Sequence, residues 1–464
     1  MSRVIVVSNR VAVPKNNTTA LGGLAVGIIS ALNESAGLWF GWDGTVMDPV
    51  SAEVSLVQQN GVTFATIPLS SQDYEQYYMG FSNRMLWPLF HYRLNLVKYR
   101  REDFVGYERV NKLFARKLLP LLEPNDILWI HDYHLIPLGN ALRMAGVTQP
   151  IGFFLHIPFP PLDVLRALPV YERLLRYLCA YDLVGFQTTY DRRSFVDSIE
   201  HAIGRKAQRG EMITAWGRHL RADVFPIGID VDEVVAMAAK GRQAKKTQKL
   251  RDSLGGRQLF IGVDRLDYSK GLTERFQAFG RLLECYPDNQ GKVVFMQIAA
   301  PSRTDVPEYK EIRRSLATVV GQINGRFAEY DWTPIRHINK GFSRASVMGF
   351  LSIGHVGVVT PLRDGMNLVA KEFIAAQDPD DPGVLLLSQL AGAAQELDSA
   401  VFVNPYDIDG IAEGMQYAIS MPLNERTERW QHMMTILRKN DINAWRDGFL
   451  RGLLETHRKL KRVS

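Results

Sequence analysis

The chain has 464 residues, of which 46% are apolar and 22% are charged, and its formal net charge is +6. This composition is typical of a globular protein and excludes a disordered or fibrous one, while the length suggests two or more domains. The charge is modest for this size, so it does not indicate nucleic-acid binding, and it is compatible with phosphorylated substrates.

Only two cysteines occur, Cys179 and Cys285, which is too few for a disulfide framework. The first residues run directly into the apolar segment Val4–Val7, without the layout of a signal peptide. No apolar run approaches the roughly 20 residues that a membrane span needs. These features predict a cytoplasmic protein that is not attached to a membrane.

Short apolar runs recur along the chain, with helical patterns between them. In the first half they cover Val4–Ser8, Ile127–His131, Gly152–His156, Leu183–Phe186 and Val224–Pro226. In the second half they cover Leu259–Val263, Val293–Ile298, Val356–Val359, Val384–Leu387 and Val401–Val403. Most lack strict alternation, as expected of strands covered on both faces. Strands that alternate with helices predict an α/β fold with parallel sheets.

The first predicted strand ends at Arg10, and a Gly22-Gly23 pair follows before an apolar helical pattern. Glycines between a strand and a helix let backbone N–H groups approach a phosphate closely. The spacing is neither G-x-G-x-x-G nor a P-loop, so it matches neither the nicotinamide nor the ATP fingerprint. For the glycine pair alone, a plain turn is the simpler interpretation.

Two later strands also end on polar groups, around Asp132 and at His156. The histidines lack the spacing of known zinc sites, so no metal is predicted. Asp132 and His156 fit better as partners of sugar hydroxyls or of a leaving group, and buried structural histidines are the alternative. Tyr78 and Trp87 could wall a sugar site, and core packing is the equal alternative for both.

The best domain boundary lies near Gly228–Arg251, where a basic, Ala-rich stretch precedes a fresh strand. This stretch lacks interleaved aromatic residues, so it indicates a solvated helix face and not a nucleic-acid patch. The predicted domains cover residues 1–235 and 236–440. A helical tail over 441–464 should dock one apolar face, and we expect it to pack back on the first domain.

The segment Leu259–Gly271 brings several charged residues into one loop after a strand. Arg265 and Lys270 could hold a diphosphate, the arginine as a planar fork and the lysine as a point charge. Each such charge-assisted hydrogen bond is worth about 1.5–3 kcal/mol. An internal ion-pair cluster with Asp264 and Asp267 is the alternative.

The segment Val356–Glu372 is the most informative part of the chain. It predicts a buried strand, a polar loop with Asp364, and a helix that starts near Asn367. Ligands of parallel sheets bind past the carboxyl ends of strands, and a helix start favours anions. Asp364 and Glu372 could accept hydrogen bonds from sugar hydroxyls, or the loop could be a solvated surface. Arg303 adds a cation after another predicted strand.

Taken together, several of these segments resemble the trehalose-6-phosphate synthase family. They are VSNR, GGL, YYMGFSN, LWPLFHYR, WIHDYHL, FLHIPFP, VDRLDYSKGL, TPLRDGMNLVAKE and NPYD. The resemblance spans nearly the whole chain. It implies a GT-B glycosyltransferase, with two Rossmann-like domains and a C-terminal helix. It also implies metal-independent transfer of glucose, with retention, from a nucleotide-glucose, usually UDP-glucose, to glucose-6-phosphate. The product would be α,α-trehalose-6-phosphate, which serves osmoprotection.

The resemblance assigns residues to two sites. The implied acceptor site comprises Arg10, Tyr78, Trp87, Asp132 and Arg303, with Arg10, Tyr78 and Arg303 near the 6-phosphate. The implied donor site comprises Gly22, Gly23, Arg265, Lys270, the Phe342 backbone, Asp364, Leu368, Val369, Ala370, Lys371 and Glu372. Within it, Arg265 and Lys270 would hold the diphosphate, Glu372 the ribose and Asp364 the donor sugar. His156 would contact the donor sugar near the reaction centre, so the implied catalytic residues are Arg265, Lys270, His156 and Asp364.

Two other functions remain open from the sequence. One is a related transferase with another phosphorylated acceptor, such as glycerol-3-phosphate or a pseudo-sugar phosphate. The other is a non-catalytic sugar-phosphate sensor on the same fold, against which the intact Arg265, Lys270 and Asp364 argue. The expected partners are small-molecule substrates, with no nucleic acid and no membrane. Homo-oligomerisation and the choice among UDP, GDP and ADP are left open.

Overall fold

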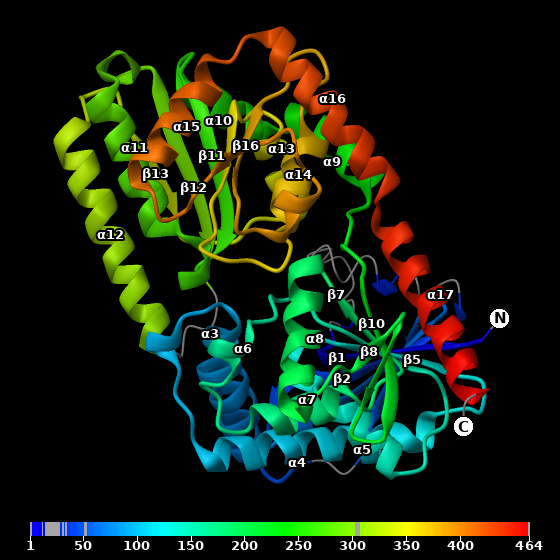
Figure 1. The fold of residues 1–464 in the computed structure, drawn as a ribbon. Helices are drawn as coiled ribbons and strands as arrows, with labels where there is room; N and C mark the ends of the chain where they lie inside the picture. Colours follow the sequence, from blue (N-terminus) through cyan, green and yellow to red (C-terminus); the bar gives the residue numbers. More distant parts are fainter. Residues whose placement is uncertain are drawn as a thin grey trace. The chain divides into compact units, whose positions relative to one another are not determined.

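The structure is a computed structural model that describes residues 2–11, 13, 28–29, 32, 35–50, 53–301 and 307–462 (Figure 1). The chain forms two compact units. The N-terminal unit comprises Met1–Pro226 and Asn443–Ser464, and the C-terminal unit comprises Ile227–Ile442. The sequence placed the boundary later, at residue 235. The units divide earlier because α9 (Val231–Gln243) packs on α13 (Arg344–Leu351) and α14 (Leu368–Ala376), inside the C-terminal unit.

Among the described residues, the N-terminal unit contains a ten-stranded sheet in the order β3-β4-β2-β1-β5-β6-β7-β10-β9-β8. From β4 to β10 all neighbours are parallel, and β3, β8 and β9 pair antiparallel at the two ends. The strand order reverses between β1 and β5, as in a Rossmann fold. The strands are β1 (Val4–Arg10), β2 (Leu38–Val46), β3 (Ser55–Gln59), β4 (Val62–Leu69), β5 (Ile127–His131), β6 (Ile151–Phe154), β7 (Leu183–Phe186), β8 (Gln208–Arg209), β9 (Met212–Ala215) and β10 (Arg218–Val224).

Helices cover this sheet in Figure 1, and α4 and α5 lie side by side along it. Phe114 of α4 meets Phe40 of β2 edge-on, with ring centroids 5.5 Å apart, so α4 packs directly on the sheet. The helices are α2 (Ser71–Asp73), the π-helix η1 (Tyr74–Leu86), α3 (Trp87–Phe90), η2 (Leu94–Leu96), α4 (Arg101–Leu118), η3 (Leu119–Leu121), η4 (Tyr133–Leu135), α5 (Leu138–Met144), α6 (Leu162–Leu165), α7 (Tyr171–Leu178) and α8 (Thr189–Ile203).

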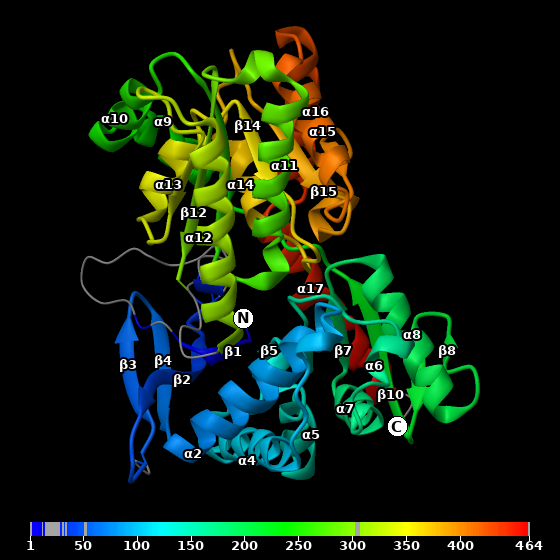
Figure 2. The same ribbon diagram turned by 90° about the vertical axis from the view of Figure 1, so that its left-hand side faces the viewer.

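The C-terminal helix α17 (Ile442–Lys461) docks on the sheet of the N-terminal unit (Figure 2). Its Phe449 is buried and stacks on Trp129 of β5 at 5.1 Å. Gly152 and Gly185 admit this ring, because a Cβ at either position would lie less than 3 Å from it, at 2.7 and 2.8 Å. The small residues on β6 and β7 therefore form the seat for the helix.

The C-terminal unit contains, among its described residues, a sheet of six parallel strands in the order β13-β12-β11-β14-β15-β16. The order reverses between β11 and β14, again as in a Rossmann fold. The strands are β11 (Gln258–Arg265), β12 (Val293–Ala300), β13 (Ile335–Ile338), β14 (Val356–Val359), β15 (Val384–Ser388) and β16 (Val401–Val403). The expected α/β fold with two Rossmann-like sheets is confirmed.

The helices of this unit lie on both faces of its sheet, and α11 and α12 run side by side in Figures 1 and 2. The remaining helices are α10 (Lys245–Leu254), η5 (Tyr268–Lys270), α11 (Leu272–Cys285), η6 (Pro287–Asn289), α12 (Pro307–Phe327), η7 (Gly392–Gln395), α15 (Ile408–Ser420) and α16 (Leu423–Lys439). The basic stretch that the sequence assigned to a solvated helix face forms the end of α9 and the mostly exposed α10.

Several strands of the structure differ from those that the sequence patterns predict. β2 and β13 carry glycine or charged residues within the strand, which interrupts the apolar run. β10 begins at Arg218 and not at Val224, because it alternates charged residues with the buried Leu220 and Ala222. A half-exposed strand has this period-2 pattern, and a search for continuous apolar runs does not find it.

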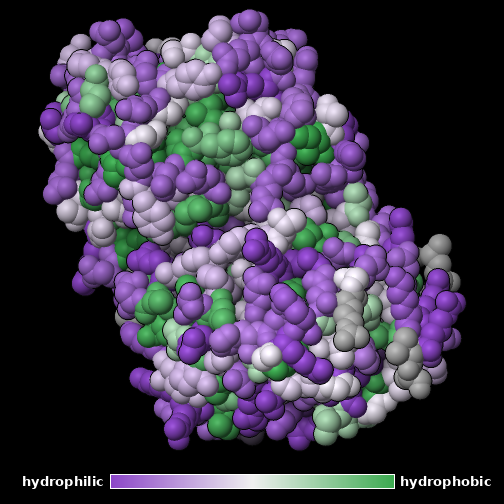
Figure 3. Space-filling model, viewed as in Figure 1, coloured by the Kyte–Doolittle hydropathy of each residue, from purple (hydrophilic) through white to green (hydrophobic). Residues whose placement is uncertain are grey.

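No helix in the described part of the chain is long and apolar enough to cross a membrane. On the face shown in Figure 3, apolar side chains form small, separate groups among polar ones.

The guanidinium of Arg275 is a buried polar link inside the C-terminal unit. The side chain is fully buried, and it donates to Asp264 Oδ2 at 2.6 Å and to Gln297 Oε1 at 2.7 Å. It also donates to Thr360 Oγ1 at 3.0 Å and to the Lys270 carbonyl at 3.3 Å. Arg275 thereby joins β11 and β12 to the loops that follow β11 and β14.

We expect Arg275→Leu to lower the free energy of unfolding by about 3–5 kcal/mol, because it leaves the Asp264 carboxylate buried without its counter-ion. The urea midpoint, followed by circular dichroism, measures this loss. Arg314→Leu, at an exposed position of α12, is the control and should change the midpoint little. Equal midpoints for the two variants would contradict the role given to Arg275.

Candidate active site

Polar side chains gather at one edge of the N-terminal sheet. Arg10 is the last residue of β1, Asp132 directly follows β5, and His156 lies just beyond β6. β1 and β5 are the neighbours between which the strand order reverses. Ligands of doubly wound sheets bind at this point. The register of the sheet therefore brings together three residues that the sequence predicted separately.

An aromatic shelf, formed by Trp42, Tyr78 and His134, lies beside Arg10. The Arg10 Cζ atom is 5.8 Å from the centroid of Trp42, and Trp42 lies 5.5 Å from Tyr78. Tyr78 stacks on His134 at 6.0 Å and 12°. Gly44 has a φ of +92°, and a Cβ there would lie 2.6 Å from Arg10 Nη2, so this turn needs glycine. The arginine and the stacked rings together suit a sugar phosphate.

Tyr78 is carried by η1, a π-helix of 13 residues. Long π-helical segments are rare, and π-bulges concentrate at functional sites. The hydroxyl of Tyr77 donates to Asn9 Oδ1 at 2.8 Å, which ties η1 to the end of β1. Trp87 is buried at 4% exposure beside Tyr133, 5.7 Å away. It thus packs in the core, whereas Tyr78 is partly exposed.

Asp132 has a strained backbone, with φ +76° and ψ 166°. Residues other than glycine rarely adopt this region, which costs about 1–3 kcal/mol. Two hydrogen bonds hold it: Asp132 N donates to the Phe154 carbonyl at 2.8 Å, and His156 N donates to Asp132 Oδ1 at 3.2 Å. Such strain concentrates at functional sites, so the geometry agrees with a role for Asp132 in ligand binding.

His156 pairs with a second histidine. Its Nε2 lies 3.0 Å from Nδ1 of His131, and the two rings stack at 5.2 Å. Burial lowers the pKa of His156 to about 3, and burial together with His156 lowers the pKa of His131 well below its usual value. Both imidazoles are therefore neutral at pH 7, and one donates to the other. His131 is the residue that fixes the ring of His156.

A second polar cluster lies at the edge of the C-terminal sheet, where the order reverses between β11 and β14. Lys270, in the loop after β11, places Nζ 2.5 Å from Oδ2 of Asp364, in the loop after β14. Asn367 Nδ2 donates to the same carboxylate at 3.0 Å. Both charged side chains are mostly buried, at 11% and 15% exposure. An anionic ligand bound here would compete with Asp364 for Lys270.

Arg265 is the last residue of β11 and is exposed at the same edge of the sheet. Phe342 is partly exposed, and its ring lies 5.3 Å from that of Phe350. Gly22, Gly23 and Arg303 lie outside the described residues.

The helix start predicted near Asn367 is present as α14. Asn367, with φ +78°, caps it by accepting from Ala370 N at 3.3 Å. Leu368 and Val369 are partly exposed, whereas Ala370, Lys371 and Glu372 are buried. The N–H groups of such a helix start favour an anion. This end of α14 lies beside the Lys270–Asp364 pair, because Asn367 both caps the helix and donates to Asp364.

Glu372 lies 3.6 Å from the guanidinium of Arg344, which also pairs with Glu233. Burial raises the pKa of Glu372, and the arginine opposes this shift. Arg344 therefore favours the charged form of Glu372, which accepts hydrogen bonds from hydroxyl groups.

Lys371 is fully buried and holds both segments through which the chain leaves the C-terminal unit. Its Nζ donates to the Ile227 carbonyl at 2.7 Å and to Glu396 Oε2 at 2.6 Å. Asn440 donates to the other oxygen of Glu396 at 3.0 Å. Burial lowers the pKa of Lys371, and Glu396 opposes the shift. The side chain of Lys371 therefore points to these two segments, and its implied place in the donor site stays a prediction.

The sequence patterns do not predict that Trp42, Arg344 and Glu396 belong to these clusters. Lys371 and Glu372 stand in the apolar run LVAKEFIAA, and charged residues are almost never fully buried unless they are paired. That pattern signals that partners exist. It does not identify them, because Arg344 and Glu396 lie on other elements. Among the described residues, no group of three or more His, Cys, Asp or Glu is arranged to hold a metal ion.

Two Rossmann-type sheets, each with charged side chains where its strand order reverses, are the architecture of a GT-B glycosyltransferase. The chain belongs to glycosyltransferase family 20, whose profile matches residues 2–455. The resemblance inferred from the motifs is thereby confirmed, and the protein is an enzyme of the glycosyltransferase class.

Relatives support this assignment over the full length. The chain is 51% identical over 456 residues to a trehalose-6-phosphate synthase of Enterobacter sp. (strain 638), covering 98% of this chain and 96% of that protein. A solved alpha,alpha-trehalose-phosphate synthase (UDP-forming) from Burkholderia xenovorans, in complex with glucose-6-phosphate, is 52% identical with a TM-score of 0.95, covering 98% and 100% of the two chains. The Escherichia coli enzyme bound with UDP-2-fluoro glucose is 49% identical with a TM-score of 0.93, covering 97% and 99%.

The paired histidines predict how stability depends on pH. The unfolded pKa of histidine is about 6.5, whereas that of His156 is about 3 in the folded protein. Between these values the unfolded chain binds one more proton. The contribution of His156 is therefore complete above about pH 6.5 and is lost as the pH falls toward 3, by up to about 1.4 kcal/mol per pH unit.

We expect His156→Gln to reduce this slope by about one proton, measured as the urea midpoint from pH 7 to pH 4.5. His201→Gln, at an exposed position of α8, should leave the slope unchanged. An unaltered slope in His156→Gln would show that the ring is solvated and charged in the native state.

Proposed function

We propose that the chain transfers glucose from UDP-glucose to glucose-6-phosphate, giving α,α-trehalose-6-phosphate with retention of the donor configuration. The observation that carries the proposal is the pairing of Lys270 with Asp364 at the switch point of a sheet, in a chain about 50% identical over nearly its full length to enzymes that bear this name. The two solved relatives are described with the acceptor and with a fluorinated donor analogue, respectively.

In this proposal the cluster of the N-terminal unit binds the acceptor. Arg10 holds the 6-phosphate with its planar fork, which matches the oxygens of a phosphate monoester. Tyr78 lies between Trp42 and His134 in the aromatic shelf, is partly exposed, and can cover the sugar face. Asp132, held in its strained conformation, can accept hydrogen bonds from acceptor hydroxyls. Trp87 supports this site from the core.

The cluster of the C-terminal unit binds the donor. Lys270 and Arg265 hold the diphosphate, and the start of α14 adds N–H groups. When the diphosphate binds Lys270, it replaces Asp364 as the partner of the ammonium group. The carboxylate of Asp364 can then accept hydrogen bonds from the donor sugar. Glu372, whose charged form Arg344 favours, can accept hydrogen bonds from the ribose.

The chemistry follows from where charge develops. The bond between the anomeric carbon and the diphosphate oxygen breaks with its electron pair on the oxygen, and the sugar becomes oxocarbenium-like. Lys270 and Arg265 stabilise the negative charge on the leaving group, which is the main electrostatic contribution. The acceptor hydroxyl attacks on the same face and passes its proton to the leaving oxygen. No protein nucleophile is required. Neutral His156 can hydrogen-bond to the donor sugar beside the reacting carbon.

We further propose that the reaction needs no metal ion and takes place in the cytoplasm. Lys270 and Arg265 neutralise the charge of the diphosphate in this proposal. A divalent metal ion would otherwise have this role. Both cysteines are free, Cys179 buried and Cys285 exposed, and unpaired cysteines are usual in a reducing compartment.

The decisive experiment measures UDP release from UDP-glucose, with and without glucose-6-phosphate, and identifies the sugar product by mass. Rapid release that depends on glucose-6-phosphate, that yields trehalose-6-phosphate and that survives excess EDTA supports the proposal. Faster release with glycerol-3-phosphate would instead favour a related transferase. Binding of both substrates without turnover would favour a sensor.

We expect Arg10→Ala to raise the KM for glucose-6-phosphate by at least about tenfold, because a charge-assisted hydrogen bond worth about 1.5–3 kcal/mol is lost. The affinity for UDP-glucose, measured by calorimetry, should change far less. Arg205→Ala, at an exposed position of the same unit, is the control. If Arg10→Ala lost UDP-glucose binding and kept the KM for glucose-6-phosphate, Arg10 would belong to the donor site.

We expect Lys270→Ala to lower kcat/KM by at least about thirtyfold, equivalent to about 2 kcal/mol of transition-state stabilisation. Steady-state kinetics with varied UDP-glucose measure this change. Lys249→Ala, exposed on α10, should behave like the parent. Near-normal turnover of Lys270→Ala would mean that its bond to Asp364 is only structural.

A further inference from the structure

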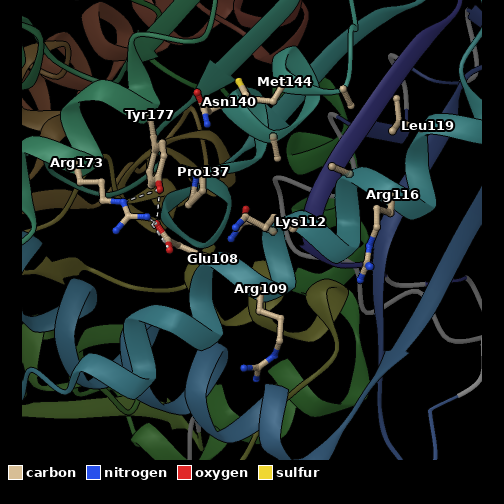
Figure 4. A pocket seen from close by; sticks show the side chains of 14 residues that line it. Glu108, Arg109, Lys112, Arg116, Leu119, Pro137, Asn140, Met144, Arg173 and Tyr177 are labelled. Atoms are coloured by element: carbon tan, nitrogen blue, oxygen red, sulfur yellow. Dashed lines mark hydrogen bonds and ion pairs between the residues drawn. The ribbon is translucent and has the colours of Figure 1, made fainter.

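A pocket of about 710 Å³ lies in the N-terminal unit, on residues that belong to none of the clusters described above. It is lined by α4, by α5 and the residues that flank it, and by α7, and we call it the α4 pocket (Figure 4). Its volume is within the range of about 300–1,000 Å³ that is usual for small-molecule sites. The proposed reaction gives it no role.

One end of the α4 pocket is a fixed polar network. Figure 4 shows Glu108, Arg173 and Tyr177 meeting there. Arg173 lies 2.8 Å from Glu108 Oε1 and donates to the Tyr177 hydroxyl at 2.9 Å, while that hydroxyl donates to Glu108. Each group satisfies the others, so Tyr177 presents a rigid aromatic wall.

Lys112 and Arg116 supply two positive charges to the lining of the α4 pocket. They stand one helical turn apart on α4, both are exposed, and neither makes an ion pair or side-chain hydrogen bond with the residues that the structure describes. Arg109 is different, since it is paired with Asp73 at 2.6 Å. Like charges at this spacing repel each other, and a bound anion would relieve that repulsion.

Apolar residues make up part of the lining of the α4 pocket. They are Ala115, Leu119, Pro137, Ala141 and Met144. The side chain of Met144 is 78% exposed. A mainly apolar lining with a few charged groups is the usual make-up of a small-molecule site.

Asn111 connects the α4 pocket to the aromatic shelf. It lines the pocket, is fully buried, and donates from Nδ2 to the carbonyls of Tyr107 at 2.9 Å and His134 at 3.1 Å. Its Oδ1 is buried without a partner among the described residues. His134 in turn stacks on Tyr78. One residue thus separates the pocket from the shelf that we assign to the acceptor.

We propose that the α4 pocket binds a small organic anion with an apolar or aromatic body, and that its occupancy changes the affinity for the acceptor sugar phosphate. The first half stands on the pocket alone. The second half rests on the proposed function, because it takes Tyr78 to belong to the acceptor site.

The probe for the first half is 1-naphthyl phosphate, titrated calorimetrically into the protein with UDP and glucose-6-phosphate at saturation. We expect one site. 1-Naphthol, which has no charged group, and inorganic phosphate, which has no aromatic ring, should each bind at least about tenfold more weakly than 1-naphthyl phosphate.

Charge reversal locates this site. Lys112→Glu and Arg116→Glu should each weaken 1-naphthyl phosphate at least about tenfold. Lys249→Glu and Arg205→Glu, the same changes at exposed positions elsewhere, should bind like the parent. Three results would overturn the site. The parent could fail to bind 1-naphthyl phosphate, or it could bind 1-naphthol equally well. Arg116→Glu and Arg205→Glu could also bind 1-naphthyl phosphate with equal affinity.

The KM for glucose-6-phosphate tests the second half. In the parent, saturating 1-naphthyl phosphate should change the KM for glucose-6-phosphate at least about twofold. In Arg116→Glu, the same addition should leave this KM unchanged. Asn111→Leu should still bind the probe, but its KM should no longer respond. A parent KM that does not respond despite binding would overturn the coupling and leave the site. A parent without turnover would overturn the proposed function, and the calorimetric result would still decide the pocket.

Discussion

The buried guanidinium of Arg275 holds together the part of the C-terminal unit on which the donor cluster depends. It meets a carboxylate of β11, an amide of β12 and a hydroxyl after β14, and it also reaches the carbonyl of Lys270. A buried charge is tolerated only when its partners are complete. The backbone of Lys270 is itself a partner in this network, so Arg275 contributes to the position of Lys270.

The two units use the same arrangement for different chemistry. Each places its charged side chains where the strand order reverses, which is where doubly wound sheets bind their ligands. The N-terminal unit adds aromatic rings beside Arg10, which suit a sugar phosphate. The C-terminal unit adds a lysine–carboxylate pair and a helix start, which suit a diphosphate linked to a sugar. One topology thus serves both proposed substrates.

Buried polar residues next to these clusters do the positioning. His131 fixes the ring of His156, Arg344 faces Glu372, and Lys371 with Glu396 holds the segments that leave the C-terminal unit. None of these partners is adjacent in sequence to the group it positions. The α4 pocket has a buried polar residue of this kind as well. Asn111 lines the pocket and donates to the carbonyl of His134 in the aromatic shelf.

The sequence by itself determined the α/β class, most central strands, the helix start after Asn367 and the family, because runs of buried residues and whole motifs are local features. Arg10, Asp132 and His156 could be singled out because they end strands. Only the tertiary structure decided that Trp87 packs in the core, that β2 and β13 join the sheets, and that Arg344 and Glu396 complete the donor cluster. Those outcomes depend on register and burial, which arise from residues far apart in the chain.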